Sequence, residues 1–461
     1  MAVNFMPFAR KMGAAGASDI QVESFRRNYL QAFESGKCYI HEDDIAPVGS
    51  VHNFMELPQL SKQRENELLK RCAVLKLNGG LATTMGLKGT PKSLVRVKGT
   101  LSFLDITILQ IRRKRAKIGA RFLPLILMNS FNTSAETMSC ITNNRAMLEQ
   151  SVPMELMQSR VPRINADTLE PYTCSEDPNS EWCPPGHGDI YMSLYSTSLL
   201  AELLSNNIRY VFLSNIDNLG ASLDARIPAL MEERRCPFLM EVSRRCETDK
   251  KGGHLARDVY GGYVLRESSM CTPEDRQYFS DIDRYRYFNT NNIWFDVEKM
   301  YRLVIGHNGL LNLPVIKNSK ILGDGQKIFQ LETACGSAIS LFEDAIALEV
   351  PRSRFAPVKG LSDLLAVRSD AYVMREDNTI TLADGKMSPP VIVLPEQVKT
   401  IESMEAMFPC GIPSLVNCDR LQIEGPVIFG KDVRCVGEVK ILANSRAVIE
   451  DGSVLQGEVV I

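Results

Sequence analysis

"AVLKLNGGLATTMGLKGTPKSL", residues 73 to 94, is the stretch that decides the fold of this chain. Its mainly apolar start is typical of a buried strand, and paired glycines follow directly. Backbone amides at a strand end can hydrogen-bond phosphate or a base edge, because Gly79 and Gly80 carry no side chain that blocks a close approach. The spacing fits neither GxGxxG nor GxxxxGK[ST], so the glycines alone leave phosphate binding and a structural turn equally open.

Three further apolar runs have the same character: "FLPLILM" (122–128), "RYVFLSN" (209–215) and "PFLMEV" (237–242). The intervals between the runs are long enough for crossover helices. This pattern predicts an α/β fold with a largely parallel sheet that is covered on both faces. Ligands bind such sheets at the carboxyl ends of the strands, where the glycine loop lies.

The flanking segments carry weaker signals. Residues 18–35 have helical spacing behind a Ser/Asp cap, and 61–72 predict a short helix that leads into the first strand. Between them, 41–54 are interpreted as a polar connector. The stretch 163–186 is rich in Pro, Asp, Ser and Gly, which favours an ordered surface loop and leaves a disordered linker as the alternative.

The end of the chain contains a repeat. Residues 427–441, "VIFGKDVRCVGEVKI", align with 448–461, "VIEDGSVLQGEVVI", at an offset of 20 to 21. Short valine-rich strands separated by glycine at that period predict a solenoid of parallel β coils, with a plain hairpin array as the alternative. We expect this region to serve packing and self-association rather than catalysis.

Composition bounds the class of protein. The chain has 461 residues, 44% of them hydrophobic and 23% charged, which predicts two or three globular domains. Because 53 Lys and Arg nearly balance 55 Asp and Glu, no basic field is present that would attract nucleic acid. No run approaches the roughly 20 apolar residues of a membrane span, so we expect a soluble protein without a membrane partner.

The cysteines indicate the cellular location of the protein, and the histidines bear on whether it binds zinc. Twelve cysteines are scattered without a CxxC pair, which favours reduced thiols and a cytoplasmic location. The five histidines lie far apart, so a zinc site is not expected.

Two motifs place polar groups next to predicted strands or turns. In "PPGHGDIY" (184–191), His187 can donate a hydrogen bond to phosphate, while Asp189 is interpreted as the cap of a following helix. In "FLSNIDNLGA" (212–221), Asp217 lies just past a strand end, which suits Mg²⁺ held by a carboxylate and phosphate oxygens. An Asx turn at Asn218 is the structural alternative.

Two more segments suit a sugar. "DKKGGHLA" (249–256) exposes backbone at Gly252 and Gly253, and "FNTNNIW" (288–294) supplies three amide side chains. Amides donate and accept at once, as sugar hydroxyls require, although asparagines also close turns.

The last motif is basic. "VPRSRFAPVKGLSDLL" (350–365) contains Arg352, Arg354 and Lys359 between prolines, followed by a predicted helix capped near Ser362. Three cations on a stiff segment suit a charge clamp, and a solvated face is the alternative.

The order of the motifs is more specific than any one of them. "LKLNGG", "LMNSFNT", "PPGHGDIY", "SNIDNLGA", "KGGHL", "FNTNNIW", "QLETACGSAI" and "VPRSRFAPVK" together resemble the blocks of the eukaryotic-type UTP–glucose-1-phosphate uridylyltransferase family, from about residue 70 onward. The resemblance implies a helical N-terminal segment (1–68) and a Rossmann-like, glycosyltransferase-A-like nucleotidyltransferase domain with a mixed, mostly parallel sheet (69–385). It also implies a C-terminal left-handed parallel β-helix (386–461).

The resemblance also implies roles for individual residues. Those expected along the nucleotide are Leu77, Asn78, Gly79, Gly80, Gln158 and Gly186. Those expected to face the sugar phosphate are His187, Asn215, Asp217, Gly253, Glu267, Asn289 and Asn291. Asp217 is the expected Mg²⁺ ligand, and the expected catalytic contacts to the phosphates come from Lys92 and Lys359.

The implied reaction joins UTP and glucose 1-phosphate into UDP-glucose and pyrophosphate, reversibly and with Mg²⁺. The sugar phosphate attacks the α-phosphorus in line, and no general base is needed because a phosphate monoester is already ionised at pH 7. Two alternatives stay open: a broad-specificity UDP-sugar pyrophosphorylase and a catalytically weakened regulatory homologue. The oligomeric state is expected to be a monomer or a homo-oligomer formed through the C-terminal domain.

The glycine loop departs from the family pattern. Ala82 replaces a glycine, and one extra residue lies near Thr90. An alanine restricts positive φ, and an insertion changes the path from Gly80 to Lys92. The position of Lys92 is therefore the assignment that these departures put most in question.

Overall fold

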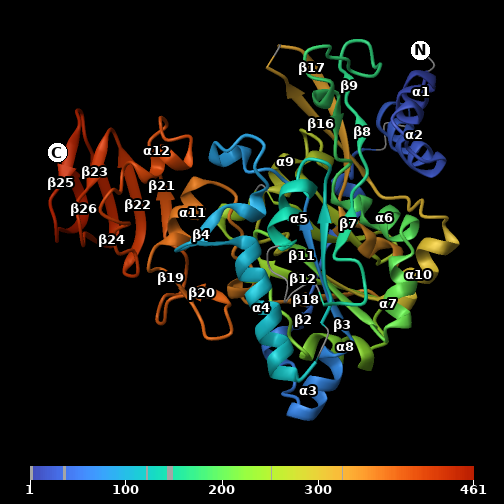
Figure 1. Cartoon of the computed structure of the whole chain (residues 1–461), viewed down its shortest axis with the longest axis horizontal. Helices are drawn as coiled ribbons and strands as arrows, with labels where there is room; N and C mark the ends of the chain where they lie inside the picture. Colours follow the sequence, from blue (N-terminus) through green and yellow to red (C-terminus); the bar gives the residue numbers. More distant parts are fainter. Residues whose placement is uncertain (1–3, 35–37, 121–122, 143–148, 251, 324) are drawn as a thin grey trace.

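The computed structural model describes residues 4–34, 38–120, 123–142, 149–250, 252–323 and 325–461. A central sheet with helices around it lies between the N-terminal helices and the C-terminal strands (Figure 1). The main path of the sheet runs, in spatial order, through β2 (His52–Asn53), β18 (Ile346–Glu349), β12 (Phe238–Arg244), β15 (Tyr287–Asp296), β11 (Tyr210–Asn215), β3 (Cys72–Asn78), β6 (Leu125–Asn129) and β7 (Glu155–Met157).

Most strands of the central sheet run parallel. β11, β3, β6 and β7 pair in parallel, as do β12, β18 and β2, while β15 lies antiparallel between β11 and β12. The four apolar runs predicted as strands are β3, β6, β11 and β12. The predicted α/β fold with a mixed, mostly parallel sheet is confirmed.

Successive residues of each central strand face opposite cores. On β3, Val74 packs into the cluster that contains Phe212 and Trp294, whereas Ala73 and Leu75 pack into the cluster on the other face. The rings of Phe212 and Trp294 stack with centroids 4.5 Å apart. Because both faces are buried, the strands appear in the sequence as continuous apolar runs.

Helices cover both faces of the sheet. Those packed into the first core are α3 (Lys62–Leu69), α4 (Phe103–Ile118), α8 (Arg226–Glu233) and α11 (Leu361–Arg368). Those packed into the second are α6 (Ile190–Ser196), α7 (Leu199–Ser205) and α10 (Val297–Gly306). The short helix predicted before the first strand is confirmed as α3, whose cap Ser61 accepts a hydrogen bond from the N–H of Arg64 at 3.2 Å.

Two helices form an N-terminal layer, α1 (Met6–Ala14) and α2 (Asp19–Phe33). The helix predicted over 18–35 is confirmed as α2, where the Ser18 N–H donates to Gln21 Oε1 at 2.9 Å. Aromatic side chains of both helices pack against Trp182 and Leu331. The layer therefore rests on the strands that flank the "PPGHGDIY" loop.

The connector interpretation of 41–54 was incomplete. It contains β1 (Ile45–Pro47), paired with β13 (His254–Asp258), and β2, paired with β18. Strands of two or three residues are too short to produce an alternating pattern, so they form only because an edge of the sheet offers free partners.

The stretch 163–186 is ordered, and the disordered alternative is excluded. It includes β9 (Ile164–Asn165) and β10 (Trp182–Cys183), which pair with neighbouring strands. The remaining elements around the sheet are β4 (Arg96–Lys98), β5 (Leu101–Ser102), α5 (Ser134–Thr142), β8 (Val161–Pro162), β14 (Tyr263–Arg266), α9 (Arg276–Phe279), β16 (Val315–Ile321), β17 (Lys327–Thr333), β19 (Tyr372–Met374) and β20 (Ile380–Leu382).

The C-terminal strands pair in parallel, which excludes the hairpin alternative. They are β21 (Val391–Val393), β22 (Cys418–Glu424), β24 (Arg434–Leu442) and β26 (Val454–Val460) in one sheet and β23 (Val427–Phe429) with β25 (Ala447–Ile449) in another; α12 (Ile401–Glu405) precedes most of them.

The register of the repeat differs from the predicted alignment. Ile428 lies opposite Val448, and Val439 lies opposite Gly457, whereas the alignment matched Val427 with Val448 and Val439 with Val459. An irregularity between Cys435 and Val439 shifts the pairing of β24 with β26. A repeat in sequence cannot reveal such a shift, because backbone bulges leave no apolar signature.

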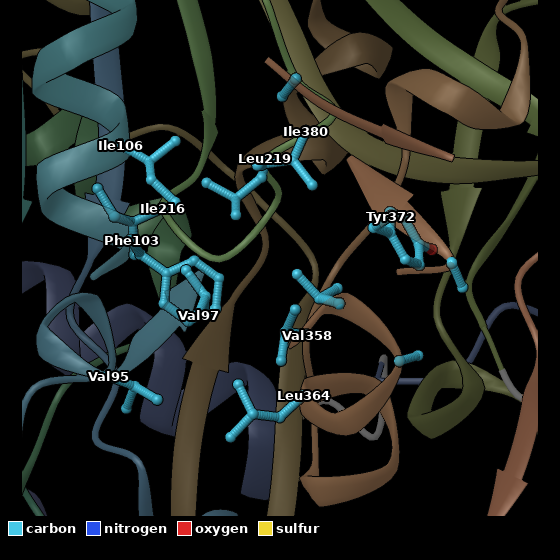
Figure 2. Packing of buried hydrophobic residues seen from close by; sticks show 14 of the residues in the cluster. Val95, Val97, Phe103, Ile106, Ile216, Leu219, Val358, Leu364, Tyr372 and Ile380 are labelled. Carbon is cyan, nitrogen blue, oxygen red and sulfur yellow. The ribbon is translucent and has the colours of Figure 1, made fainter. Parts of the chain in front are cut away.

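One core continues from the central sheet into the C-terminal strands. Phe103 and Val97 belong to the same buried cluster as Leu364, Tyr372 and Ile380 (Figure 2). That cluster also includes buried side chains of β22 and β24. In the part of the chain that the structure describes, no helix combines the length and apolarity needed to cross a membrane.

Candidate functional site

A cavity of about 390 Å³ lies at the carboxyl ends of β3 and β11. Ten of the predicted residues line it: Leu77, Gly79, Gly80, Lys92, Gln158, Gly186, His187, Asn215, Asp217 and Lys359. These residues come from segments spread over nearly 300 positions of the chain. The parallel strands bring them together, because their carboxyl ends meet at one edge of the sheet.

The glycine loop closes on itself before it delivers Lys92. Leu81 pairs with Pro91, and the Lys92 N–H donates to the Gly80 carbonyl at 3.0 Å. Ala82 has φ −83°, so this position requires no glycine. The positive φ angles fall at Gly86 (+79°) and Gly89 (+78°), and the extra residue is accommodated in the closed loop. Lys92 therefore reaches the cavity despite the departures from the family pattern.

Gly79 and Gly186 flank the amide of Gln158. A Cβ on Gly79 would lie 2.6 Å from Gln158 Oε1, and Gln158 Nε2 donates to the Gly186 carbonyl at 2.6 Å. Gly186 has φ +81°, and a Cβ there would lie 2.5 Å from the Thr333 carbonyl. Gly186 is thus required by its positive φ and its close approach to backbone, while Gly79 leaves room for the Gln158 amide. Together they expose an amide and bare backbone that suit a flat base.

Asn78 does not line the cavity. Its side chain is buried and donates to Asn129 Oδ1 at 2.7 Å and to Thr137 Oγ1 at 3.1 Å. The Asn78 side chain therefore fixes the loop from behind, and contact with a ligand could come only from its backbone.

His187 is held in one tautomer. The Cys335 N–H donates to His187 Nδ1 at 2.9 Å, so in the neutral ring the proton resides on Nε2. Burial lowers the pKa of His187 to about 4. At pH 7 the ring is an uncharged donor, which can serve an oxygen without adding a cation.

Asp189 does not cap the following helix as predicted. Its carboxylate accepts from the Ser159 N–H at 2.7 Å and from Ser193 Oγ at 3.2 Å. Burial raises the pKa of Asp189. The carboxylate thereby fixes the residue next to Gln158, an interaction across 30 positions that no local pattern indicates.

Asp217 and Lys92 form an ion pair at the edge of the cavity. Lys92 Nζ lies 2.5 Å from Asp217 Oδ2. Asp217 Oδ1 is buried and has no hydrogen-bond partner among the described residues. An orphaned carboxylate oxygen beside a cavity is the donor that a hard cation such as Mg²⁺ prefers.

A metal at this position would depend on the substrate for its other ligands. In the described ranges, no group of three His, Cys, Asp or Glu side chains could hold an ion. Mg²⁺ commonly binds through one or two carboxylates and substrate phosphates rather than in an all-protein cage. The residues present therefore fit the predicted Mg²⁺ at Asp217.

Lys359 enters the cavity from the loop before α11. Its carbonyl accepts from Thr84 Oγ1 at 2.8 Å, and its N–H donates to Asp363 Oδ2 at 2.8 Å. The helix predicted to be capped near Ser362 begins at Leu361, and its cap is made by Asp363, which accepts from the amides at 359 and 360.

The two arginines of the basic segment do not line the cavity. Arg352 pairs with Asp249, and Arg354 is buried against Glu241. Lys359 is therefore the cation of that segment that reaches the cavity. The charge pattern of the sequence did not separate its structural cations from the one at the site.

The remaining predicted residues form a polar cluster beside the cavity. Asn291 Nδ2 donates to Asn215 Oδ1 at 2.8 Å, and the Asn291 N–H donates to Asn289 Oδ1 at 2.8 Å. Asn291 itself has φ +59°, a left-handed conformation that asparagine tolerates. The cluster thus continues from the cavity wall at Asn215 toward Asn289.

Glu267 and Gly253 complete this cluster. A Cβ on Gly253 would lie 2.5 Å from the Glu267 carboxylate, so the glycine makes room for it. Burial raises the pKa of Glu267, and nearby Lys359 opposes that rise. A carboxylate accepts hydrogen bonds only, which suits the hydroxyl groups of a sugar.

The sequence did not single out Glu332 or Lys76. Glu332 lines the cavity beside Gly186, within the "QLETACGSAI" block. Lys76 is buried on β3, where its Nζ donates to Ser214 Oγ at 2.7 Å and burial lowers its pKa to about 8. For Lys76, the sequence did contain a signal, because a lysine within an apolar run is unusual.

The chain is similar to known proteins in sequence and in structure. The sequence model of the UTP–glucose-1-phosphate uridylyltransferase family matches residues 22–435. UTP–glucose-1-phosphate uridylyltransferase 2 of Dictyostelium discoideum is 36% identical over 449 residues, which cover 95% of this chain and 87% of the relative.

Solved structures are also similar. UDP-glucose phosphorylase from Trypanosoma brucei has a TM-score of 0.91 and 42% identity, with 99% of each chain covered. A mutant of UDP-glucose pyrophosphorylase from Leishmania major, in complex with UDP-glucose, has a TM-score of 0.92 and 41% identity, with both chains fully covered (100%). The chain therefore belongs to the UTP–glucose-1-phosphate uridylyltransferase family, which confirms the family and the enzyme class that the sequence blocks predicted.

Proposed function

We propose that this chain forms UDP-glucose and pyrophosphate from UTP and glucose 1-phosphate, in a reversible Mg²⁺-dependent reaction. The observation that carries the proposal is the pairing of Lys92 with Asp217, which has one open oxygen, in the same cavity as Lys359. Two cations and a free carboxylate oxygen suit the transfer of an anionic group between two phosphates.

The nucleotide end of the cavity is proposed at Gly79, Gly80, Gln158 and Gly186. The Gln158 amide can donate and accept toward the edge of uracil, while the glycines leave room for its flat face. Leu77 adds apolar contact at the carboxyl end of β3.

The sugar-phosphate end is proposed at His187, Asn215 and the cluster that follows Asn215. The neutral His187 ring donates through Nε2–H, and Glu267 accepts from sugar hydroxyls. Gly253, Asn289 and Asn291 support this end through their contacts with Glu267 and Asn215.

The chemistry requires positioned charge more than proton transfer. Lys92 Nζ has three protons, so it can keep its contact with Asp217 and also donate to a phosphate. Lys359 approaches from a different segment and can stabilise charge that develops as pyrophosphate leaves. When bound at Asp217 Oδ1, Mg²⁺ would offset the repulsion between the two anionic substrates.

Several finer features are proposed with this function. We propose the domain division 1–68, 69–385 and 386–461, and a left-handed β-helix for the C-terminal strands, which their parallel pairing supports. We also propose a cytoplasmic enzyme, since none of the twelve cysteines forms a disulfide. It would be a monomer or a homo-oligomer that associates through the C-terminal domain.

A paired assay tests the proposal. The purified chain is incubated with UTP, Mg²⁺ and either glucose 1-phosphate or galactose 1-phosphate, and pyrophosphate release is measured. We expect release with glucose 1-phosphate, much less with galactose 1-phosphate, and loss of release with chelator. Equal rates with both sugars would favour the broad-specificity pyrophosphorylase, and no release with either would favour the weakened homologue.

A further inference from the structure

The segment that carries Lys359 is held by an ion pair deep inside the protein. Arg354 Nε donates to Glu241 Oε2 at 2.8 Å, and Arg354 Nη2 donates to Glu241 Oε1 at 2.5 Å. Glu241 is 0% exposed and Arg354 is 6% exposed. Two parallel hydrogen bonds to one carboxylate fix the direction of the guanidinium as well as its position.

The Glu241 carboxylate is fully engaged by the central sheet. Trp294 Nε1 donates to Oε1 at 2.9 Å, and Asn292 Nδ2 donates to Oε2 at 3.1 Å. All three residues lie on β12 and β15, in the middle of the sheet. Arg354 is therefore attached to the middle of the central sheet.

The same network reaches the loop that carries Asp217. The Arg354 carbonyl accepts from Asn218 Nδ2 and from Asn292 Nδ2, each at 3.2 Å. Asn218 Oδ1 in turn accepts from the Ala356 N–H at 2.9 Å. The side chain of Asn218 thus joins two segments of the chain instead of closing a local Asx turn.

Backbone contacts bring the two segments closer still. The Val358 N–H donates to the Asp217 carbonyl at 3.2 Å, and a Cβ on Gly220 would lie 2.4 Å from the Ser353 carbonyl. Ile216, Leu219 and Val358 point into one core (Figure 2). The neighbours of Asp217 and of Lys359 are therefore packed together.

We infer that Arg354 and Glu241 are positioning residues, which fix Lys359 relative to Asp217 so that both meet the reacting phosphates. This inference rests on the proposed function, because it assigns Lys359 a role at the transition state. An apolar pair could stabilise the core as well as an ion pair does, but it would not hold one orientation. Neither residue lines the cavity, so they act through the segment 354–359.

The test removes both charges at once. In the double variant Glu241→Gln with Arg354→Met, no unpaired charge is left in the core, so the unfolding temperature should stay near that of the wild type. We expect kcat to fall about 100-fold, the order of loss that a displacement of about 1 Å causes, while KM for UTP changes less than about threefold. A matched control is Lys11→Met with Glu181→Gln, a part-buried pair that joins α1 to the segment 163–186, which should leave kcat unchanged.

A cycle with Lys359→Ala separates positioning from general damage. If the pair acts through Lys359, the double variant should lower kcat by less than about threefold further in the Lys359→Ala background. A full additional loss of about 100-fold there would overturn the inference. So would wild-type kcat in the double variant.

Arg354→Lys provides a second arm if the double variant does not fold. It keeps the charge but loses the two-point contact, and we expect a kcat about tenfold below wild type with an unchanged KM. Wild-type kcat in Arg354→Lys would also overturn the inference. Failure of the wild type to release pyrophosphate would instead count against the proposed function, so the two failures are distinguishable.

Discussion

Two ion pairs in this enzyme have opposite designs. Lys92 and Asp217 lie at the cavity with side chains 16% and 12% exposed, and one Asp217 oxygen has no partner among the described residues. Arg354 and Glu241 lie in the core, where each carboxylate oxygen accepts two hydrogen bonds. A saturated pair has no capacity for a ligand, whereas an unsaturated pair does. Of these two pairs, the one at the cavity is therefore the one with capacity left for a ligand.

Removing the cation of the core pair should have the largest effect on stability. Arg354→Met leaves the Glu241 carboxylate buried without its countercharge, so we expect a loss of about 3–5 kcal/mol in the free energy of unfolding. Urea unfolding measures it. The Glu241→Gln, Arg354→Met double variant is the control and should recover most of that loss.

Lys359→Ala tests the cation that the core pair positions. We expect kcat to fall by about 10²–10³-fold while KM for UTP changes little, because the contact strengthens only as charge develops on the leaving pyrophosphate. Steady-state kinetics with UTP varied at saturating glucose 1-phosphate decides between these effects. Equal losses in kcat and UTP affinity would contradict a transition-state role.

Lys92→Met completes the comparison at the cavity. Water in the cavity can solvate the Asp217 carboxylate that is left, so the free energy of unfolding should fall by only about 1 kcal/mol or less. Activity should fall far more than stability. A destabilisation as large as that of Arg354→Met, again measured by urea unfolding, would show that the two pairs are equivalent.

The smallest expected effect concerns His187 and pH. With its pKa lowered from 6.5 to about 4, the ring is neutral at and above about pH 5.5, so kcat/KM should have the same pH profile from about pH 5.5 to 8 in the wild type and in His187→Gln. The free energy of unfolding should change with pH in the opposite direction to that of a protein with a salt-bridged histidine. The unfolded chain binds the proton first, so stability is lost as pH falls from about 6.5 toward 4. A wild-type profile that bends near pH 6.5 while that of His187→Gln does not would show a charged ring.

The strands could be predicted because their signal is local. β3, β6, β11 and β12 appear as apolar runs, since strands buried on both faces need apolar residues at every position. Lys359 and Asp217 could be named as candidates because one lies in a stiff basic segment, the other lies just past a strand end, and both fall within family blocks. Neither the apolar pattern nor the family blocks show which distant side chain each residue contacts in the folded chain.

The misassigned residues share one cause. Asp189 was expected to cap a helix and instead holds Ser159. For Asn218 an Asx turn was the structural alternative, and its side chain instead binds Ala356. Short polar side chains have local and distant partners of similar energy, so tertiary proximity selects between them. The register of β24 with β26 belongs to the same class of error, because a bulge depends on the partner strand.

By itself, the sequence determined the class of fold, the family and the residues that can carry charge to phosphate. It also placed the glycine loop "LNGG" at the end of a strand. Only the tertiary structure decided which charges line the cavity. Arg352, Arg354 and Lys359 are three similar cations in the sequence. In the folded chain Arg352 pairs with Asp249, Arg354 is buried against Glu241, and Lys359 lines the cavity. The physical reason is that solvation and pairing set the role of a charge, and both are properties of the folded chain.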